Sequence, residues 1–425
     1  MDIVTRPLKS TVRRYLLAAV LVPCAAISQA ATEPSVEREQ QIIRQIDREV
    51  TQNGPYSEQL IEPLLSLSLL YDEADEDAPF EATIERLLQV VRANYGLYSL
   101  EQAPIIRQLV RRMQASGNAE TAWALEQELL ELARRHPDDS RSAQIFRETG
   151  DRRLELLRRY DAGERLAEIA LGCYYDDSKE YLKAKVRGSR PIFSAPMSEL
   201  RNKCAAGSKN QARRAILLEA QSYYFASADI LLANEEYTNE LRQALWEIVR
   251  SSARYYTPIP GRQALQLLRA FEDRESEVLL PRIEAQVRIA DHDLLYSPVL
   301  GTKNRDSALA EYLDAYALLA EHGIGEDTVR EMFAPEMPIV LPAFMPNPLV
   351  SPESPDSIGH IDIRFQVGAD GKGSDIEVLD SSANASRAAA RDLVETIKRS
   401  RFRPLIEDNE LLDPATFTLR YYLDD

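Results

Sequence analysis

Histidine is scarce in this chain of 425 residues, with four copies scattered along it, and the common catalytic motifs are missing. There is no HExxH, CxxC or GxSxG, no P-loop and no Rossmann glycine pattern. The acidic run at residues 72–77 lacks the glycine and the distal glutamate of a calcium loop, which favours a solvated turn. We therefore predict a protein without enzymatic activity, cofactor or metal; an enzyme with no recognisable motif is the alternative.

Positive charge is also in short supply, because 51 Lys and Arg face 68 Asp and Glu, which gives a formal net charge of −17. A nucleic-acid-binding surface needs basic groups that displace the counterions of the phosphates. An anionic membrane surface attracts basic segments for the same electrostatic reason. The charge balance argues against both, and we expect protein or peptide partners and no nucleic acid.

The N-terminal apolar run is too short for an ordinary transmembrane helix, which needs about 20 residues. It covers 13 residues, 15–27; basic residues precede it and Ser28-Gln29-Ala30 follows it. This is the pattern of a secretory signal. We predict that residues 1–30 are a signal peptide, cleaved between Ala30 and Ala31, and that the protein is periplasmic. An uncleaved inner-membrane anchor is the alternative, and only then would the membrane be a partner.

Cysteine occurs three times, and Cys24 lies inside the signal segment, where a lipoprotein modification is a further alternative. The remaining pair, Cys173 and Cys204, would enter an oxidising compartment, where such pairs are commonly bridged. We predict a disulfide between them, which would stabilise the fold by about 3–4 kcal/mol in the chain-entropy model. Two buried thiols are the alternative, and a mass change of two hydrogens on reduction distinguishes them.

Strand-like alternation is rare between residues 37 and 333, where apolar residues recur at helical spacing. Gly54-Pro55-Tyr56-Ser57 recurs as Gly96-Leu97-Tyr98-Ser99, 42 residues later. Ala82 and Ala124 stand at the same spacing, where we expect a small residue at a helix crossing. The pattern is similar to tetratricopeptide repeats of long period and predicts a solenoid of helix hairpins. Such an array is either a binding surface for a protein or a rigid spacer.

Prolines crowd the next segment, residues 334–356, which we predict to be an extended, semi-rigid linker at a domain boundary. Beyond it the apolar spacing changes to 2: residues 361–367 alternate, and a turn at 368–373 follows. A second strand at 375–380 would place Ile376 and Val378 on one face. After the second strand we predict a helix that Ser386 caps and that runs to about residue 401, and then a last strand at 416–423.

The predicted order is therefore β-β-α-β, a three-stranded antiparallel sheet with one face covered by a helix. Gly359, the alternating IDIRFQV, the Asp370-Gly371 turn, DIEVLDSS and Arg401-Phe402-Arg403-Pro404 together resemble the TonB C-terminal domain family. The fold class is thus α+β multidomain, with a helical-repeat region at 37–333 and a TonB-like domain at 357–425.

The resemblance implies that the domain binds an extended peptide of an envelope or outer-membrane protein by adding it beside the last strand. The outward side chains of this strand would be Thr416, Thr418, Arg420 and Tyr422. We therefore expect a periplasmic scaffold for protein–protein interactions. The alternatives are a TonB-type energy transducer held by an uncleaved anchor, and an envelope enzyme.

Overall fold

The computed structural model describes residues 33–164, 209–236, 238–275, 279–350 and 357–424. The chain forms two compact units, residues 1–112 and 113–425. The predicted signal cleavage site at Ala30 and Ala31 and the predicted disulfide between Cys173 and Cys204 lie outside the described residues. No helix within the described ranges is long and apolar enough to cross a membrane.

The first unit contains helices and two short 3-10 turns that repeat the same local structure. Its helices are α2 (Glu33–Asn53), α3 (Ile61–Glu73) and α4 (Asp77–Tyr95), followed by the start of α5 (Ala103–Ala115). Gly54 and Gly96 both have a φ near +95°, and the Ser57 and Ser99 hydroxyls each cap the following 3-10 turn. Both turns lead into a helix of 13 residues. The spacing of 42 residues thus extends from sequence to backbone conformation.

Apolar residues at helical spacing on α4 are buried, whereas the alanines expected at a helix crossing are not. Ile84 and Leu87 are fully buried, but Ala82 is exposed, and so is Ala124 on α6 (Ala119–Arg135). The prediction for these two alanines is wrong, because a matching spacing along the chain does not specify which side of the helix faces its neighbour.

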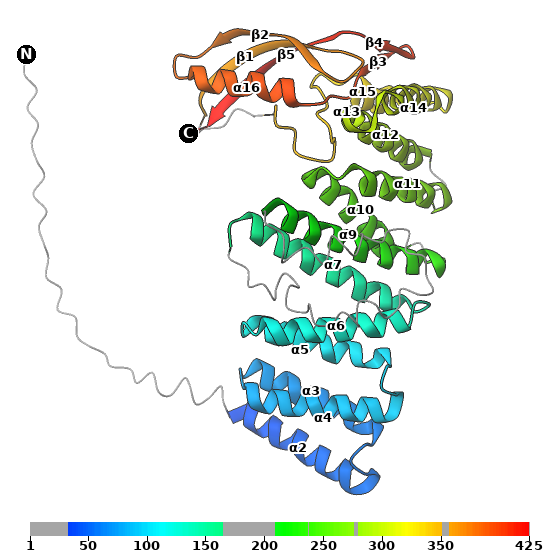
Figure 1. Ribbon diagram of the computed structural model, residues 1–425, viewed down its shortest axis with the longest axis vertical. Helices are drawn as coiled ribbons and strands as arrows, with labels where there is room; N and C mark the ends of the chain where they lie inside the picture. Colours follow the sequence, from blue (N-terminus) through cyan, green and yellow to red (C-terminus); the bar gives the residue numbers. More distant parts are fainter. Residues whose placement is uncertain (1–32, 165–208, 237, 276–278, 351–356, 425) are drawn as a thin grey trace, which may run out of the picture. The chain divides into compact units, whose positions relative to one another are not determined.

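The second unit begins with helices, most of which pack against their neighbours along the chain (Figure 1). After α6 they are α7 (Ser140–Asp161), α9 (Lys209–Ala233), α10 (Asn239–Tyr255), α11 (Pro258–Glu275), α12 (Leu279–Leu295), α13 (Ser297–Leu300), α14 (Thr302–Glu321) and α15 (Glu326–Phe333). The described residues up to Phe333 are therefore mostly helical, as predicted. The short α13 and α15 were not predicted.

The unit ends in a small antiparallel sheet of order β2-β1-β5, formed by β1 (Ser357–Val367), β2 (Gly373–Ser381) and β5 (Ala415–Asp424). Helix α16 (Arg387–Arg399) lies along one face of it (Figure 1). The helix begins where predicted, because the Ser386 hydroxyl accepts a hydrogen bond from the Ala389 amide. The helix buries Leu393 and Ile397 in a core built around Phe365 of β1.

Two features of this region were not predicted. A hairpin of two three-residue strands, β3 (Leu405–Glu407) and β4 (Glu410–Leu412), stands between α16 and β5. In addition, β2 carries a bulge: Asp362 pairs with Asp380 but Ile363 pairs with Val378, so Leu379 is the extra residue. Ile376 packs against the core, whereas Val378 is 40% exposed.

The proline-rich segment packs closely over its described part, residues 334–350. Val340 pairs with Phe402 in an isolated β-bridge, and the Leu341 amide donates to the Arg401 carbonyl at 2.7 Å. The ring of Phe344 meets Trp246 of α10 edge to face, with centroids 5.7 Å apart. This stretch thus connects the sheet to the helices through contacts as well as through the chain.

Candidate functional site

Strand β5 forms one edge of the C-terminal sheet. It pairs with β1 from Ser357–Asp424 to Val367–Ala415, and among the described residues no strand pairs with its other side. Alternate side chains, including Phe417 and Leu419, point into the core. The predicted outward set lies on the opposite face: Thr416, Thr418 and Arg420 are exposed, and Tyr422 is half-buried. The edge therefore offers unpaired backbone groups next to a row of accessible side chains.

Arg420 is fixed by a carboxylate on the neighbouring strand. Asp362 of β1 lies directly opposite Arg420 in the register, and the guanidinium donates to both carboxylate oxygens at 2.7 Å each. These hydrogen bonds hold the pKa of the Asp362 carboxyl below its usual range and raise the pKa of Arg420. The bidentate geometry orders a side chain that would otherwise move freely on the sheet surface.

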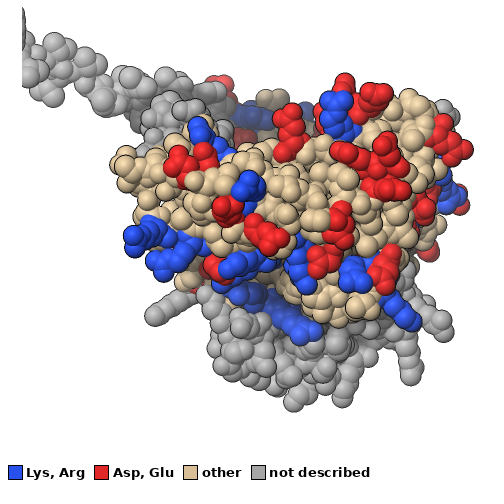
Figure 2. Space-filling model, turned by 90° about the horizontal axis from the view of Figure 1, so that it is seen from above, with Lys and Arg blue, Asp and Glu red and all other residues tan. Residues whose placement is uncertain are grey.

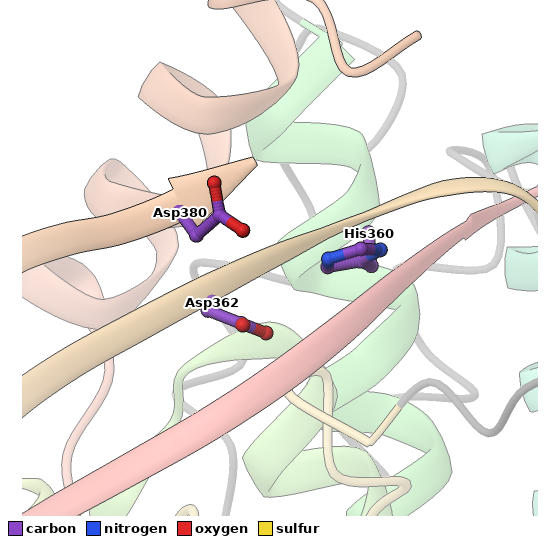
Figure 3. A group of neighbouring side chains, drawn as sticks. All are labelled: His360, Asp362 and Asp380. Carbon is purple, nitrogen blue, oxygen red and sulfur yellow. The ribbon is translucent and has the colours of Figure 1, made fainter. Parts of the chain in front are cut away.

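Two more titratable residues lie beside this pair. Figure 3 shows His360, Asp362 and Asp380 gathered on one face of the sheet, with His360 and Asp362 from β1 and Asp380 from β2. One ligand atom from each side chain lies within 4.8 Å of the other two. Imidazole nitrogen and carboxylate oxygen are atoms that divalent metal ions accept as ligands.

The sheet is attached to the helices by a buried ion pair. Arg403 donates to both oxygens of Asp291 on α12, at 2.9 and 2.6 Å, and to the Met332 carbonyl at 2.9 Å. Tyr312 of α14 donates to the same carboxylate at 2.7 Å. Burial lowers the pKa of Arg403, but the Asp291 charge outweighs burial and the net direction is upward. Burial followed by the Asp291 charge raises the pKa of Tyr312 well above its usual value.

The turn between β1 and β2 reaches the same helix. Gly371 has a φ of +71° and accepts a hydrogen bond from the Phe402 amide. A Cβ at this position would lie 2.6 Å from the Phe402 carbonyl oxygen and 3.1 Å from Leu294 of α12. Glycine is thus required here both for its backbone conformation and for the close approach of the sheet to the helix.

A cavity of about 350 Å³ lies beside the buried ion pair. Its walls come from α10, α11, α12, α15 and the proline-rich segment, and they include Asp291, His292, Phe344 and Arg403. The His292 ring faces Asp293, which also accepts three hydrogen bonds from Arg262. Burial raises the pKa of Asp293, but the bonds from His292 and Arg262 lower it overall. Arg262 with Asp293 and Arg403 with Asp291 are matched ion pairs, which is the arrangement of a structural network.

Charges on the sheet-bearing face of the second unit are mixed. Figure 2 shows Lys and Arg gathered along the lower rim of this view and acidic side chains over the upper part and to the right. No single-sign field covers the visible face, so this surface gives no sign of a polyanion site.

No family model matches the sequence, and no curated protein matches it either. The resemblance to the TonB C-terminal domain therefore depends on the residues and the order of elements alone, and it stays a prediction.

The acidic run at 72–77 has a role that the sequence did not reveal. Arg112 of α5 forms ion pairs with Asp72, Asp75 and Asp77, at 3.3, 2.8 and 2.6 Å. Asp77, through its hydrogen bond, is the main cause of the raised pKa of Arg112. Because the partner lies about one repeat further along the chain, no local pattern identifies it.

Proposed function

We propose that this protein is a periplasmic binding scaffold whose C-terminal sheet accepts an extended peptide from a protein partner alongside β5. The observation that carries the proposal is the free side of β5, an edge strand of ten residues with an accessible outward row. Main-chain hydrogen bonds to such an edge supply affinity, and the outward side chains supply selectivity. The resemblance to the TonB C-terminal domain supports the same assignment.

We further propose that the helical part is a solenoid of helix hairpins that displays this sheet. Its support is the 42-residue spacing, which relates Gly54 to Gly96 and the two 13-residue helices that follow. Repeats of this kind stack so that each unit covers the apolar face of the next. We expect the partners to be envelope proteins, including those of the outer membrane. The predicted signal peptide and the TonB-like edge strand β5 together favour this class of partner.

A photo-crosslinking amino acid placed on each side of the sheet tests the peptide site. Thr418 on β5 and Ser374 on β2 are both exposed, and both pair with residues of β1 that belong to its outward row. We expect the probe at position 418 to capture an envelope protein in intact cells and the probe at 374 to capture none. Equal capture from both positions, or none from 418, contradicts the proposal.

A further inference from the structure

The register of the sheet places two carboxylates opposite each other. Asp362 of β1 pairs directly with Asp380 of β2, and His360 lies two residues before Asp362 on the same face. The bulge at Leu379 produces this arrangement. In an unbroken ladder Leu379 would stand opposite Asp362, and Asp380 would be opposite Ile361, whose side chain is fully buried. The extra residue thus brings Asp380 to the outward face.

The charges of this group are only partly matched. Like charges directly opposite each other destabilise a pair of strands. Arg420 neutralises Asp362, whereas the hydrogen bond that the structure describes for the Asp380 carboxylate comes from the Ser381 amide. The backbone amide of His360 donates to Ser382, but within the described residues its ring forms no hydrogen bond. Among the described residues, a carboxylate with no ion-pair partner therefore lies next to an imidazole ring with no hydrogen-bond partner.

We propose that His360, Asp362 and Asp380 bind a divalent transition-metal ion of the Zn²⁺ class. Their ligand atoms lie within 4.8 Å of one another. Ligands about 2.0–2.1 Å from a tetrahedral zinc ion are about 3.3 Å apart, so closing the site takes rotation of side chains and no movement of the strands. The imidazole donor favours Zn²⁺ over Ca²⁺ and Mg²⁺, which prefer oxygen ligands. Three protein ligands leave the fourth position open to solvent.

The ion competes with Arg420 for one carboxylate. Both oxygens of Asp362 are bonded to the guanidinium, and a dication bound there would repel this group. Metal binding therefore loosens Arg420, which belongs to the outward row of β5. This competition predicts opposite effects for different substitutions: removing a ligand weakens binding, and removing Arg420 strengthens it. The metal site itself does not depend on the proposed peptide function.

Titration of the full-length chain with Zn²⁺ by isothermal calorimetry tests the site. We expect one ion per chain, and a loss of affinity of at least about a hundredfold in His360→Ala and in Asp380→Asn. Arg420→Gln should bind Zn²⁺ about tenfold more tightly, because a positive charge roughly 5 Å from the dication is gone. His322→Ala, which removes an exposed histidine at the end of α14, is the matched control and should bind as the wild type does.

Three results would overturn the proposal. If the wild type does not bind one Zn²⁺ ion per chain, the proposed metal site does not exist. Wild-type affinity in His360→Ala places the ion elsewhere, for example at Cys173 and Cys204. Weaker binding in Arg420→Gln shows that the guanidinium is not a competitor. Since a gain of affinity cannot arise from misfolding, the Arg420 variant separates a lost ligand from a damaged sheet.

Discussion

Substitution of Arg403 by methionine should destabilise the second unit more than any change to a surface ion pair. The side chains of Arg403 and Asp291 are 9% and 6% exposed, so the pair is shielded from water. Methionine approximates the length of arginine and leaves no gross void. It also leaves the Asp291 carboxylate buried with Tyr312 as its remaining hydrogen-bond donor among the described side chains.

The magnitude follows from the orphaned charge. Removing one partner of a buried ion pair costs about 3–5 kcal/mol, because the other charge stays desolvated and uncompensated. Replacing both groups, as in R403M/D291L, removes that charge and should restore part of the loss. A remainder of about 1–3 kcal/mol is expected, since the Tyr312 hydroxyl then lacks its acceptor. The same substitution in an exposed pair, R282M beside Asp273, should cost about 0–1 kcal/mol.

Urea denaturation followed by tryptophan fluorescence measures these differences in the appropriate part of the chain. Both tryptophans, Trp123 and Trp246, belong to the second unit, so the first unit contributes no signal. Trp246 also contacts Phe344 of the proline-rich segment, which places one probe beside the junction. If R403M cost no more than R282M, or if the double variant were less stable than R403M, the assignment of a buried ion-pair clamp would be wrong.

Three further outcomes are expected. Arg420 lowers the pKa of Asp362 in the folded state. The ionised Asp362 therefore stabilises the folded protein above its unfolded-state pKa, and this contribution is lost as pH falls through the folded-state pKa. D362N should flatten that part of a curve of stability against pH. Replacing Gly54 or Gly96 by alanine should cost a similar amount, about 1–3 kcal/mol each by calorimetry, because both have φ near +95°. Clearly different losses of stability in the two variants would contradict the equivalence of the turns at Gly54 and Gly96. N-terminal sequencing of the protein purified from intact cells tests the predicted signal peptide: we expect a start at Ala31, and a start at Met1 would instead support an uncleaved anchor.

Periodicity identified the elements whose determinants are local. Alternation along 361–367 predicted β1, and the Ser386 cap predicted the start of α16, because a few neighbouring residues suffice to determine each. The β3-β4 hairpin was not predicted, although the sequence contains a signal for its turn. Asp408 and Asn409 are residue types that tolerate positive φ, which both adopt here and which a tight hairpin turn requires. Its strands are three residues long, too short for an alternating pattern to stand out.

The contacts that build the sites join residues from different strands and helices. Arg403 and Asp291 are 112 residues apart, and either side chain alone resembles an ordinary surface charge. The alternation of residues 361–367 puts Asp362 among the outward positions, but the approach of Asp380 depends on a bulge that no local residue pattern predicts. Long-range pairing and strand register are set by packing of the whole unit, so sequence periodicity cannot supply them.

The junction also bears on how a partner held at β5 would be connected to the rest of the chain. Phe402 packs against Phe365 in the sheet core, with ring centroids 5.5 Å apart, and its neighbour Arg403 enters the helical part to meet Asp291. The Arg403 amide donates to the Ile339 carbonyl in the proline-rich segment, so three parts of the unit meet within two residues. Under the proposed function, a peptide bound at the edge would be held by a sheet that the buried contacts attach to α12 and α14. A semi-rigid proline-rich spacer alone would provide no direct contact between the sheet and the helices. The ion pair opposes their separation, because it would leave the Asp291 carboxylate without the Arg403 guanidinium.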